Sequence, residues 1–198
     1  MPKIKLLFYL LVLCIALPSL ALADKGEEAF EKAREYDRSN ETDKAVAALK
    51  EAVDAGHLEA HNKLAYWYWK GNGVEKDVER ARELFTAAAE EDLAIAQYQL
   101  AELIMSTDGD AEAAVKWYER AAHQKHVPAM SKAAAIYADE DNDVETNLPL
   151  AQAWYLVAKE AGGYVSEGKL EFIERKMSHN EKDEAKNLYK ELLEKLTS

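Results

Sequence analysis

The sequence is poor in cysteine, glycine, proline and basic residues. Its 198 residues include one Cys, eight Gly and four Pro, and 25 Lys and Arg stand against 37 Asp and Glu. So few Gly and Pro argue against an all-β fold cut by many turns. The formal net charge of −12 argues against nucleic acid or an anionic membrane surface as a partner, because both require a basic face. The hydrophobic fraction of 48% excludes a disordered chain.

The N-terminus has the pattern of an export signal. Lys3 and Lys5 precede an apolar run over residues 6–17, and an Ala-Leu-Ala segment follows. This order is typical of a secretory signal peptide, which we predict as residues 1–23 with cleavage before Asp24. The apolar run is too short to favour a membrane span. We therefore expect a periplasmic or secreted protein that has no membrane contact after cleavage.

Cleavage would remove Cys14, the only cysteine of the chain. A mature chain without Cys has no disulfide, no thiolate nucleophile and no Cys-based metal site. An uncleaved anchor is the alternative to cleavage. Lipidation at Cys14 is disfavoured, because Leu13 is not the small residue that a lipoprotein site would have there.

An internal repeat runs along the rest of the chain. Small or apolar residues recur at offsets 0, 3, 4 and 7 from five anchor alanines, which are 36, 33, 37 and 34 residues apart. That spacing places each set on one face of an α-helix. The anchors are Ala45, Ala81, Ala114, Ala151 and Ala185.

Polar residues before these anchors predict where the helices begin. Asp77, Asp110 and Asn147 each lie four residues before an anchor, and their side chains can accept the free N–H groups of a first turn. For the first and last segments the expected caps are Thr42 or Asn40, and Asn180. Each segment follows another apolar helical stripe, so the repeating unit is a pair of helices of about 35 residues.

One copy of the unit carries a recognisable pattern. It runs from Ala60 through Leu64-Ala65, Tyr68, Gly71, Gly73-Val74 and Asp77 to Ala81, and Trp117-Tyr118 and Trp154-Tyr155 match the end of its second helix. The pattern resembles Sel1-like repeat proteins, relatives of tetratricopeptide arrays. The third and fourth copies lack the Gly-x-Gly-Val loop, and Ala65 stands where the family prefers Gly.

The resemblance implies an all-α fold, a right-handed α-solenoid of about four helix pairs closed by a C-terminal pair of capping helices. We expect the repeats at 25–57, 58–92, 93–126 and 127–163, and the cap at 164–198. Neighbouring pairs would stack, because no single pair can bury its apolar stripe.

The polar residues indicate no chemistry. His57 and His61, like His123 and His126, fall in expected turns between repeats, and we interpret them as surface histidines rather than metal ligands. No phosphate-binding loop or Ser/His/Asp set has a supporting motif. We therefore predict no catalytic residue, no metal and no cofactor.

The aromatic residues are more informative. Those on the repeat pattern are expected in the core: Tyr68, Trp117, Tyr118, Trp154 and Tyr155. By analogy with tetratricopeptide arrays, the first helix of each pair lines the concave face. The family register then predicts a partner-binding strip at Asn62, Tyr66, Trp69, Tyr98, Glu102 and Met105. The alternative is that these side chains pack against a neighbouring repeat, the helix next to the signal peptide or a second copy in a dimer.

The resemblance also implies a function. It indicates a non-enzymatic scaffold or adaptor that binds another protein or peptide, and the negative charge favours a basic partner. One alternative is a periplasmic immunity protein that neutralises an antibacterial effector. Another is β-lactam binding or hydrolysis, which the lack of Cys in the mature chain and of a Ser-x-x-Lys motif disfavours. The sequence leaves open the partner, the oligomeric state, and whether the concave or the convex face binds.

Overall fold

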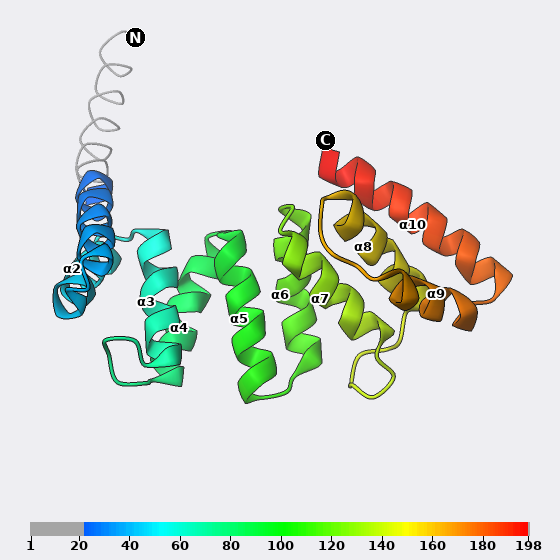
Figure 1. The fold of residues 1–198 in the computed structure, drawn as a ribbon, viewed down its shortest axis with the longest axis horizontal. Helices are drawn as coiled ribbons and strands as arrows, with labels where there is room; N and C mark the ends of the chain where they lie inside the picture. The colour runs from blue at the N-terminus through cyan, green and yellow to red at the C-terminus, as the bar shows by residue number, and fades with distance from the viewer. Residues whose placement is uncertain (1–21, 198) are drawn as a thin grey trace, which may run out of the picture. The chain divides into compact units, whose positions relative to one another are not determined.

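The computed structural model describes residues 22–197, which form helices joined by short loops, with no strand in that range (Figure 1). The predicted signal peptide lies almost entirely outside the described residues, as does Cys14. Residues 22–38 are helical. They are followed by α2 (Thr42–Asp54), α3 (Leu58–Lys70), α4 (Val78–Glu90), α5 (Ala94–Thr107), α6 (Ala111–His123), α7 (Val127–Ala138), α8 (Leu148–Glu160), α9 (Glu167–Lys176) and α10 (His179–Thr197). None of these described helices is both long and apolar enough to cross a membrane.

The helices form an all-α repeat solenoid made of two compact units, the first ending at Glu91 and the second beginning at Asp92. In the first unit, α3 packs against both α2 and α4. In the second, α5 to α8 pack in chain order, and α10 folds back against α8 beside α9 (Figure 1). The last two helices therefore cover the end of the second unit.

The predicted stripes form the core of each unit. All five anchor alanines are buried, because a methyl group is all that fits where two helices approach closely. Large side chains at the neighbouring offsets fill the space between helices, such as Phe85 in the first unit and Tyr118 and Trp154 in the second. Burying one such side chain stabilises the fold by about 1.5–3 kcal/mol. Trp117 is one exception among the aromatics expected in the core, since it is half-buried with the Arg120 guanidinium 4.7 Å from its ring centroid, and Tyr68 is another.

Three of the predicted helix caps are confirmed. The side chains of Asp77, Asp110 and Asn147 accept first-turn backbone N–H groups over 2.9, 2.8 and 2.9 Å. Each bond satisfies a donor that has no partner within the helix. These caps fix where α4, α6 and α8 begin.

The other two cap predictions are wrong. Asn40 has a φ of +59°, and Thr42 is already the first residue of α2. The N-cap position is Glu41, which makes no side-chain cap. At α10, Ser178 replaces the expected Asn180. The backbone N–H of Ser178 donates to Glu181 Oε2 over 2.7 Å, and the N–H of Glu181 donates to Ser178 Oγ over 3.4 Å. This reciprocal pair is a capping box, which holds the start of α10 more completely than a lone Asn would.

His57 is a capping residue rather than a surface histidine. It lies in the expected turn, but its side chain is only 11% exposed. Its Nδ1 accepts the N–H of Ala60 over 3.2 Å, and its ring stacks on Phe30 with 4.5 Å between centroids. The ring therefore joins the start of α3 to the helix over residues 22–38, which carries Phe30.

His126 repeats this device in the second unit. Its Nδ1 accepts the N–H of Ala129 over 3.3 Å, and its ring lies 4.7 Å from that of Tyr98. The accepting nitrogen must be unprotonated. Burial lowers the pKa of His126 below its usual value, because it disfavours the charged ring. The cap therefore requires the neutral form that burial favours.

The free energy of unfolding is expected to fall as the pH drops below about 6.5, the ordinary histidine pKa. In that range the unfolded chain takes up a proton at His126 before the folded chain does, so acid favours unfolding. His126→Asn keeps a capping side chain but does not titrate there. Urea unfolding at about pH 7.5 and about pH 5.5 should show a smaller loss in the variant. An equal loss in both proteins would contradict this role.

Candidate partner-binding surface

The first unit carries three of the predicted binding residues on α3. Tyr66 is 37% exposed, and its ring meets that of Trp69 edge to face with 6.2 Å between centroids. Trp69 also packs on the core residue Phe85 at 6.3 Å, and the Lys70 ammonium lies 3.3 Å from the Trp69 centroid. The Oδ1 of Asn62 is buried without a hydrogen-bond partner. Tyr66 is thus the most accessible of the three, while Trp69 connects this surface to the core.

Burial of two neighbouring aromatics on α3 differs from what the repeat pattern predicts. Tyr68 lies on the pattern and is expected in the core, but it is only half-buried, whereas Trp67 lies off the pattern and is buried. Trp67 follows the buried Leu64 by three positions, which places both on the same side of the helix. Tyr68 instead faces a recess beside α2.

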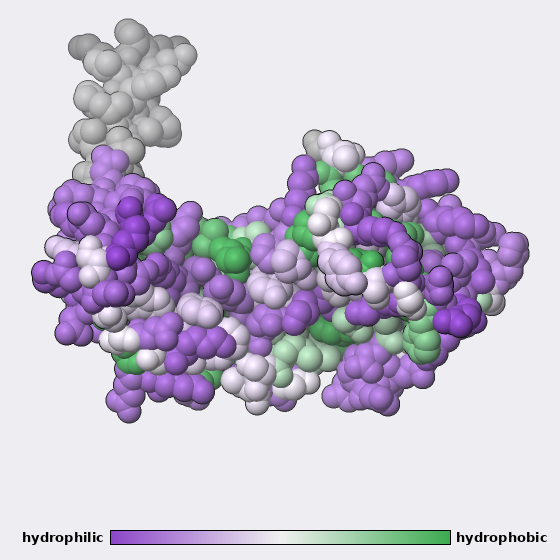
Figure 2. Space-filling view, in the orientation of Figure 1, coloured by the Kyte–Doolittle hydropathy of each residue, from purple (hydrophilic) through white to green (hydrophobic). Residues whose placement is uncertain are grey.

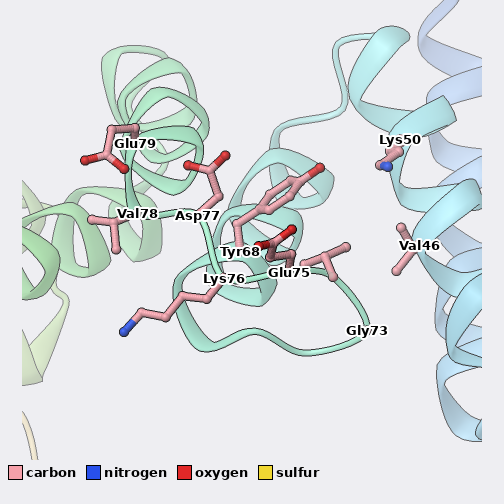
Figure 3. A pocket seen from close by; sticks show the side chains of 10 residues that line it. Val46, Lys50, Tyr68, Gly73, Glu75, Lys76, Asp77, Val78 and Glu79 are labelled. Atoms are coloured by element: carbon pink, nitrogen blue, oxygen red, sulfur yellow. The ribbon is translucent and has the colours of Figure 1, made fainter.

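That recess has a volume of about 840 Å³ and lies between α2 and the segment that joins α3 to α4 (Figure 3). Val46 and Lys50 line it from α2, and Tyr68 lines it from α3. In Figure 3 the Tyr68 ring extends toward α2, whereas the Lys76 ammonium points away from it. Gly73 has a φ of +68° and approaches α2 so closely that an added Cβ would lie 2.2 Å from a methyl group of Thr42. The Gly-x-Gly-Val loop therefore shapes this recess, a role that turn chemistry alone does not reveal.

The second unit carries the other three predicted residues on α5. Tyr98 is half-buried between the rings of Tyr118 and His126, at centroid distances of 5.8 and 4.7 Å. Glu102 accepts a hydrogen bond from the Tyr118 hydroxyl and forms an ion pair with Lys132 over 2.7 Å. Burial and the Glu102 carboxylate raise the pKa of Tyr118, so its hydroxyl remains a donor.

Met105 leaves the most exposed apolar surface of the three, with 38% of its side chain accessible. It borders a recess of about 360 Å³ between α5 and α7, together with Glu102, Ser106, Tyr118, Lys132, Ala135, Ile136, Asp139 and Asn142. The structure thus brings Glu102 and Met105 together in one recess, while Tyr98 packs behind it.

A second recess of about 530 Å³ lies on the other side of α7. It is lined by Pro128, Ser131, Lys132, Ala135, Tyr155, Tyr164, Val165, Ser166 and Lys169. Lys132 and Ala135 border both recesses. Figure 2 shows pale and hydrophobic residues gathered beside the linker into α9, among hydrophilic ones.

Sequence reasoning missed Tyr164. It lies in the segment expected to form a solvent-facing cap, yet it is 92% exposed beside an apolar recess. The available signal was an aromatic residue directly after Gly162 and Gly163, outside any helical stripe. In the part of the chain that the structure describes, no group of three or more His, Cys, Asp or Glu side chains could hold a metal ion.

Solved structures with similar folds include two Sel1-type proteins. A Sel1 repeat protein from Oxalobacter formigenes is 25% identical with a TM-score of 0.63, and the match covers 69% of this chain and 58% of that one. A protective antigen present in uropathogenic Escherichia coli strains, which displays an SLR fold, is 22% identical with a TM-score of 0.69, covering 86% and 38%. This chain therefore spans less than two thirds of either protein.

An immunity protein from Pseudomonas aeruginosa, Pa5087, is 20% identical over 83% of this chain and 82% of its own, but its TM-score is 0.37. That score is too low to support the immunity alternative, which stays a prediction. No curated protein matches the chain.

The family itself is established by the repeats. The model of the Sel1 repeat matches residues 58–93, 94–126 and 127–163, which together make up more than half of the sequence. These ranges contain the helix pairs α3–α4, α5–α6 and α7–α8. The match confirms the resemblance seen in the sequence: the chain belongs to the Sel1 repeat family.

Proposed function

We propose that the chain is an exported adaptor that binds another protein through exposed side chains of α3 and α5 and carries out no reaction itself. The observation that carries the proposal is the exposure of Tyr66 and Met105. Each is a large side chain outside the core of its unit, at a position that the family register places on the binding face. Tyr is among the residues enriched at binding hot spots, and Met at interfaces generally.

Family membership supports the same conclusion, since arrays of stacked helix pairs create extended surfaces that proteins use for binding. The export part of the proposal rests on the N-terminal sequence, with its basic start, short apolar run and Ala-Leu-Ala site.

Charge favours a partner with a basic surface. Residues 24–91 carry 17 acidic and 11 basic side chains, and residues 92–198 carry 20 and 12. Both units are therefore negative. A field of one sign accelerates encounter with a partner of opposite sign and repels like-charged proteins.

The proposal is tested by capture from the source organism, using the full chain with a C-terminal affinity tag. The double variant Tyr66→Ala/Met105→Ala is expected to weaken capture of the partner at least about tenfold, the effect of losing about 1.4 kcal/mol of binding free energy. Trp69 and Tyr98 are left intact, because each packs on a buried core ring, Phe85 and Tyr118 respectively. The mass of the captured chain also shows whether residues 1–23 have been removed.

Trp117→Ala is the matched control. It truncates a half-buried aromatic on α6, the second helix of the α5–α6 pair, whereas Tyr66 and Met105 lie on first helices. Circular dichroism of all three proteins first establishes that they are folded. A partner lost with Trp117→Ala and retained by the double variant would place the binding site on the second helices and refute the proposal as stated.

A further inference from the structure

The two recesses beside α7 share lining residues, and we call them together the α7 groove. The recess between α5 and α7 and the recess between α7 and the start of α9 share Lys132 and Ala135. Ala135 is small, so the helix presents little side-chain bulk between them. The Lys132 ammonium forms an ion pair with Glu102 over 2.7 Å, which neutralises the charge at the middle of the groove.

Apolar and aromatic groups line the α7 groove on both sides of this pair. Met105 and Ile136 border the first recess, and Pro128, Tyr155 and Tyr164 border the second. The lining of the two recesses includes three tyrosines and one methionine, and interfaces are enriched in both residue types. Tyr164, 92% exposed, is the side chain with most area to bury against a partner.

The two ends of the α7 groove differ in charge. Asp139 borders the first recess and begins a loop with five acidic side chains within residues 139–145. Glu140 in this loop pairs with Lys176 of α9 over 2.7 Å, which ties the loop to α9. At the other end, Lys169 borders the second recess, with its ammonium 5.0 Å from the Tyr155 centroid. Glu167, one of the two acidic residues that lie two positions from Lys169, pairs with Lys159.

We propose that the α7 groove binds an extended peptide segment of a partner protein, oriented by its charges. The segment carries a basic side chain toward Asp139, an acidic side chain or terminal carboxylate toward Lys169, and apolar side chains between them. This inference rests on the proposed function and names the chemistry of the partner at one site. It also refines the expectation of a basic partner, since the bound segment has both signs of charge in a fixed order.

The spacing of the two charges follows from helix geometry. An α-helix with its side chains is about 10–12 Å across, so the recesses on either side of α7 are separated by about that distance. An extended chain advances about 3.3 Å per residue. The basic and acidic residues of the segment should therefore be about three to four residues apart.

The aromatic and charged groups contribute differently. Surface charge pairs change affinity by only about one- to fivefold each, so Asp139 and Lys169 set the direction of the segment more than its affinity. A buried tyrosine anchor can change affinity by more than about tenfold. Affinity should therefore depend mainly on Tyr164, and orientation on the two charges.

The test uses the full chain and a displayed library of random linear peptides. Enriched peptides are expected to share one basic and one acidic residue in a constant order, about three to four residues apart, with apolar residues between them. A synthetic consensus peptide should bind Tyr164→Ala at least about tenfold more weakly in fluorescence anisotropy. Selection on the double variant Asp139→Lys/Lys169→Glu should yield peptides with the charge order reversed.

Lys190→Glu on α10 makes a like change of charge at an exposed position outside both recesses, and it should leave the enriched motif unchanged. The inference is overturned if the enriched peptides have no constant charge order, or if their affinity is indifferent to Tyr164→Ala. A library that yields no peptide also overturns it. Capture of a partner by the unmodified chain that is weakened in Tyr66→Ala/Met105→Ala would then leave the proposed function standing. Loss of capture by Trp117→Ala alone would refute the proposed function and not the groove.

Discussion

Trp154→Ala is expected to lower the free energy of unfolding by about 3–5 kcal/mol, the usual cost of truncating a buried tryptophan. Trp154 is 1% exposed on α8, the helix that contacts α7, α9 and α10. Its ring also meets that of His123 edge-on at 5.2 Å. The loss combines the transfer of the indole from water with the cavity that it leaves. Urea unfolding followed by circular dichroism measures it, because the variant changes the fluorescence signal itself.

Trp154→Phe is the matched control for the ring. The indole Nε1 of Trp154 is buried and has no hydrogen-bond partner, so phenylalanine removes an unsatisfied donor along with part of the ring. The phenylalanine variant should therefore recover most of the stability lost in the alanine variant. If both substitutions cost the same, the N–H group makes a bond in solution that stabilises the fold, and the cavity argument fails.

The fold could be predicted largely from the sequence because its determinants are local and repeated. A helix face is defined by residues three and four positions apart, so the stripes beginning at Ala81 and Ala151 specify both the helices and their buried sides. The caps at Asp77 and Asp110 involve bonds that span three residues. The pattern could not decide between two nearby candidates for the N-cap of α10, Ser178 and Asn180. In the structure, the reciprocal hydrogen bonds between Ser178 and Glu181 make Ser178 the cap.

The surface was less predictable because it depends on contacts between residues far apart in the chain. Tyr98 occupies a predicted binding position, but His126, which lies 28 positions later in the sequence, stacks on it. Tyr164 becomes a groove residue only because its linker lies beside α7. A register taken from a related fold predicts the direction in which a helical side chain points. It does not predict which side chains from distant parts of the sequence pack against it.

The net charge illustrates the same limit on a larger scale. A value of −12 describes the field that a distant partner meets, and it suits a basic protein. Within the α7 groove, the ion pair of Lys132 with Glu102 neutralises both charges. Asp139 borders one recess and Lys169 borders the other. The charge of the whole surface can thus determine which partner approaches, while a few charged side chains in the groove determine which segment of that partner binds.

Gly163→Ala is expected to destabilise the protein by about 1–3 kcal/mol, the usual cost of overpacking. A Cβ at this position would lie 2.5 Å from Val127 Cγ1 and 2.8 Å from the carbonyl oxygen of Ala158. The Gly163 N–H donates to that same oxygen over 2.8 Å, so the linker cannot move away without weakening the bond. The linker should shift and displace Tyr164, so the affinity for the groove peptide should fall together with stability.

Gly162→Ala separates crowding from backbone strain. Gly162 has a φ of +87° but open space around it, so alanine there should cost about 1 kcal/mol of left-handed strain and leave peptide affinity nearly unchanged. Val127→Ala in the Gly163→Ala background removes one of the two close contacts, and the double variant should be more stable than the two single losses added together predict. Strict additivity would show that Val127 does not limit this position. The clash of the new Cβ with the carbonyl oxygen of Ala158 would then account for the whole loss of stability. The position of the linker beside the α7 groove would depend on this backbone contact and not on the Val127 side chain.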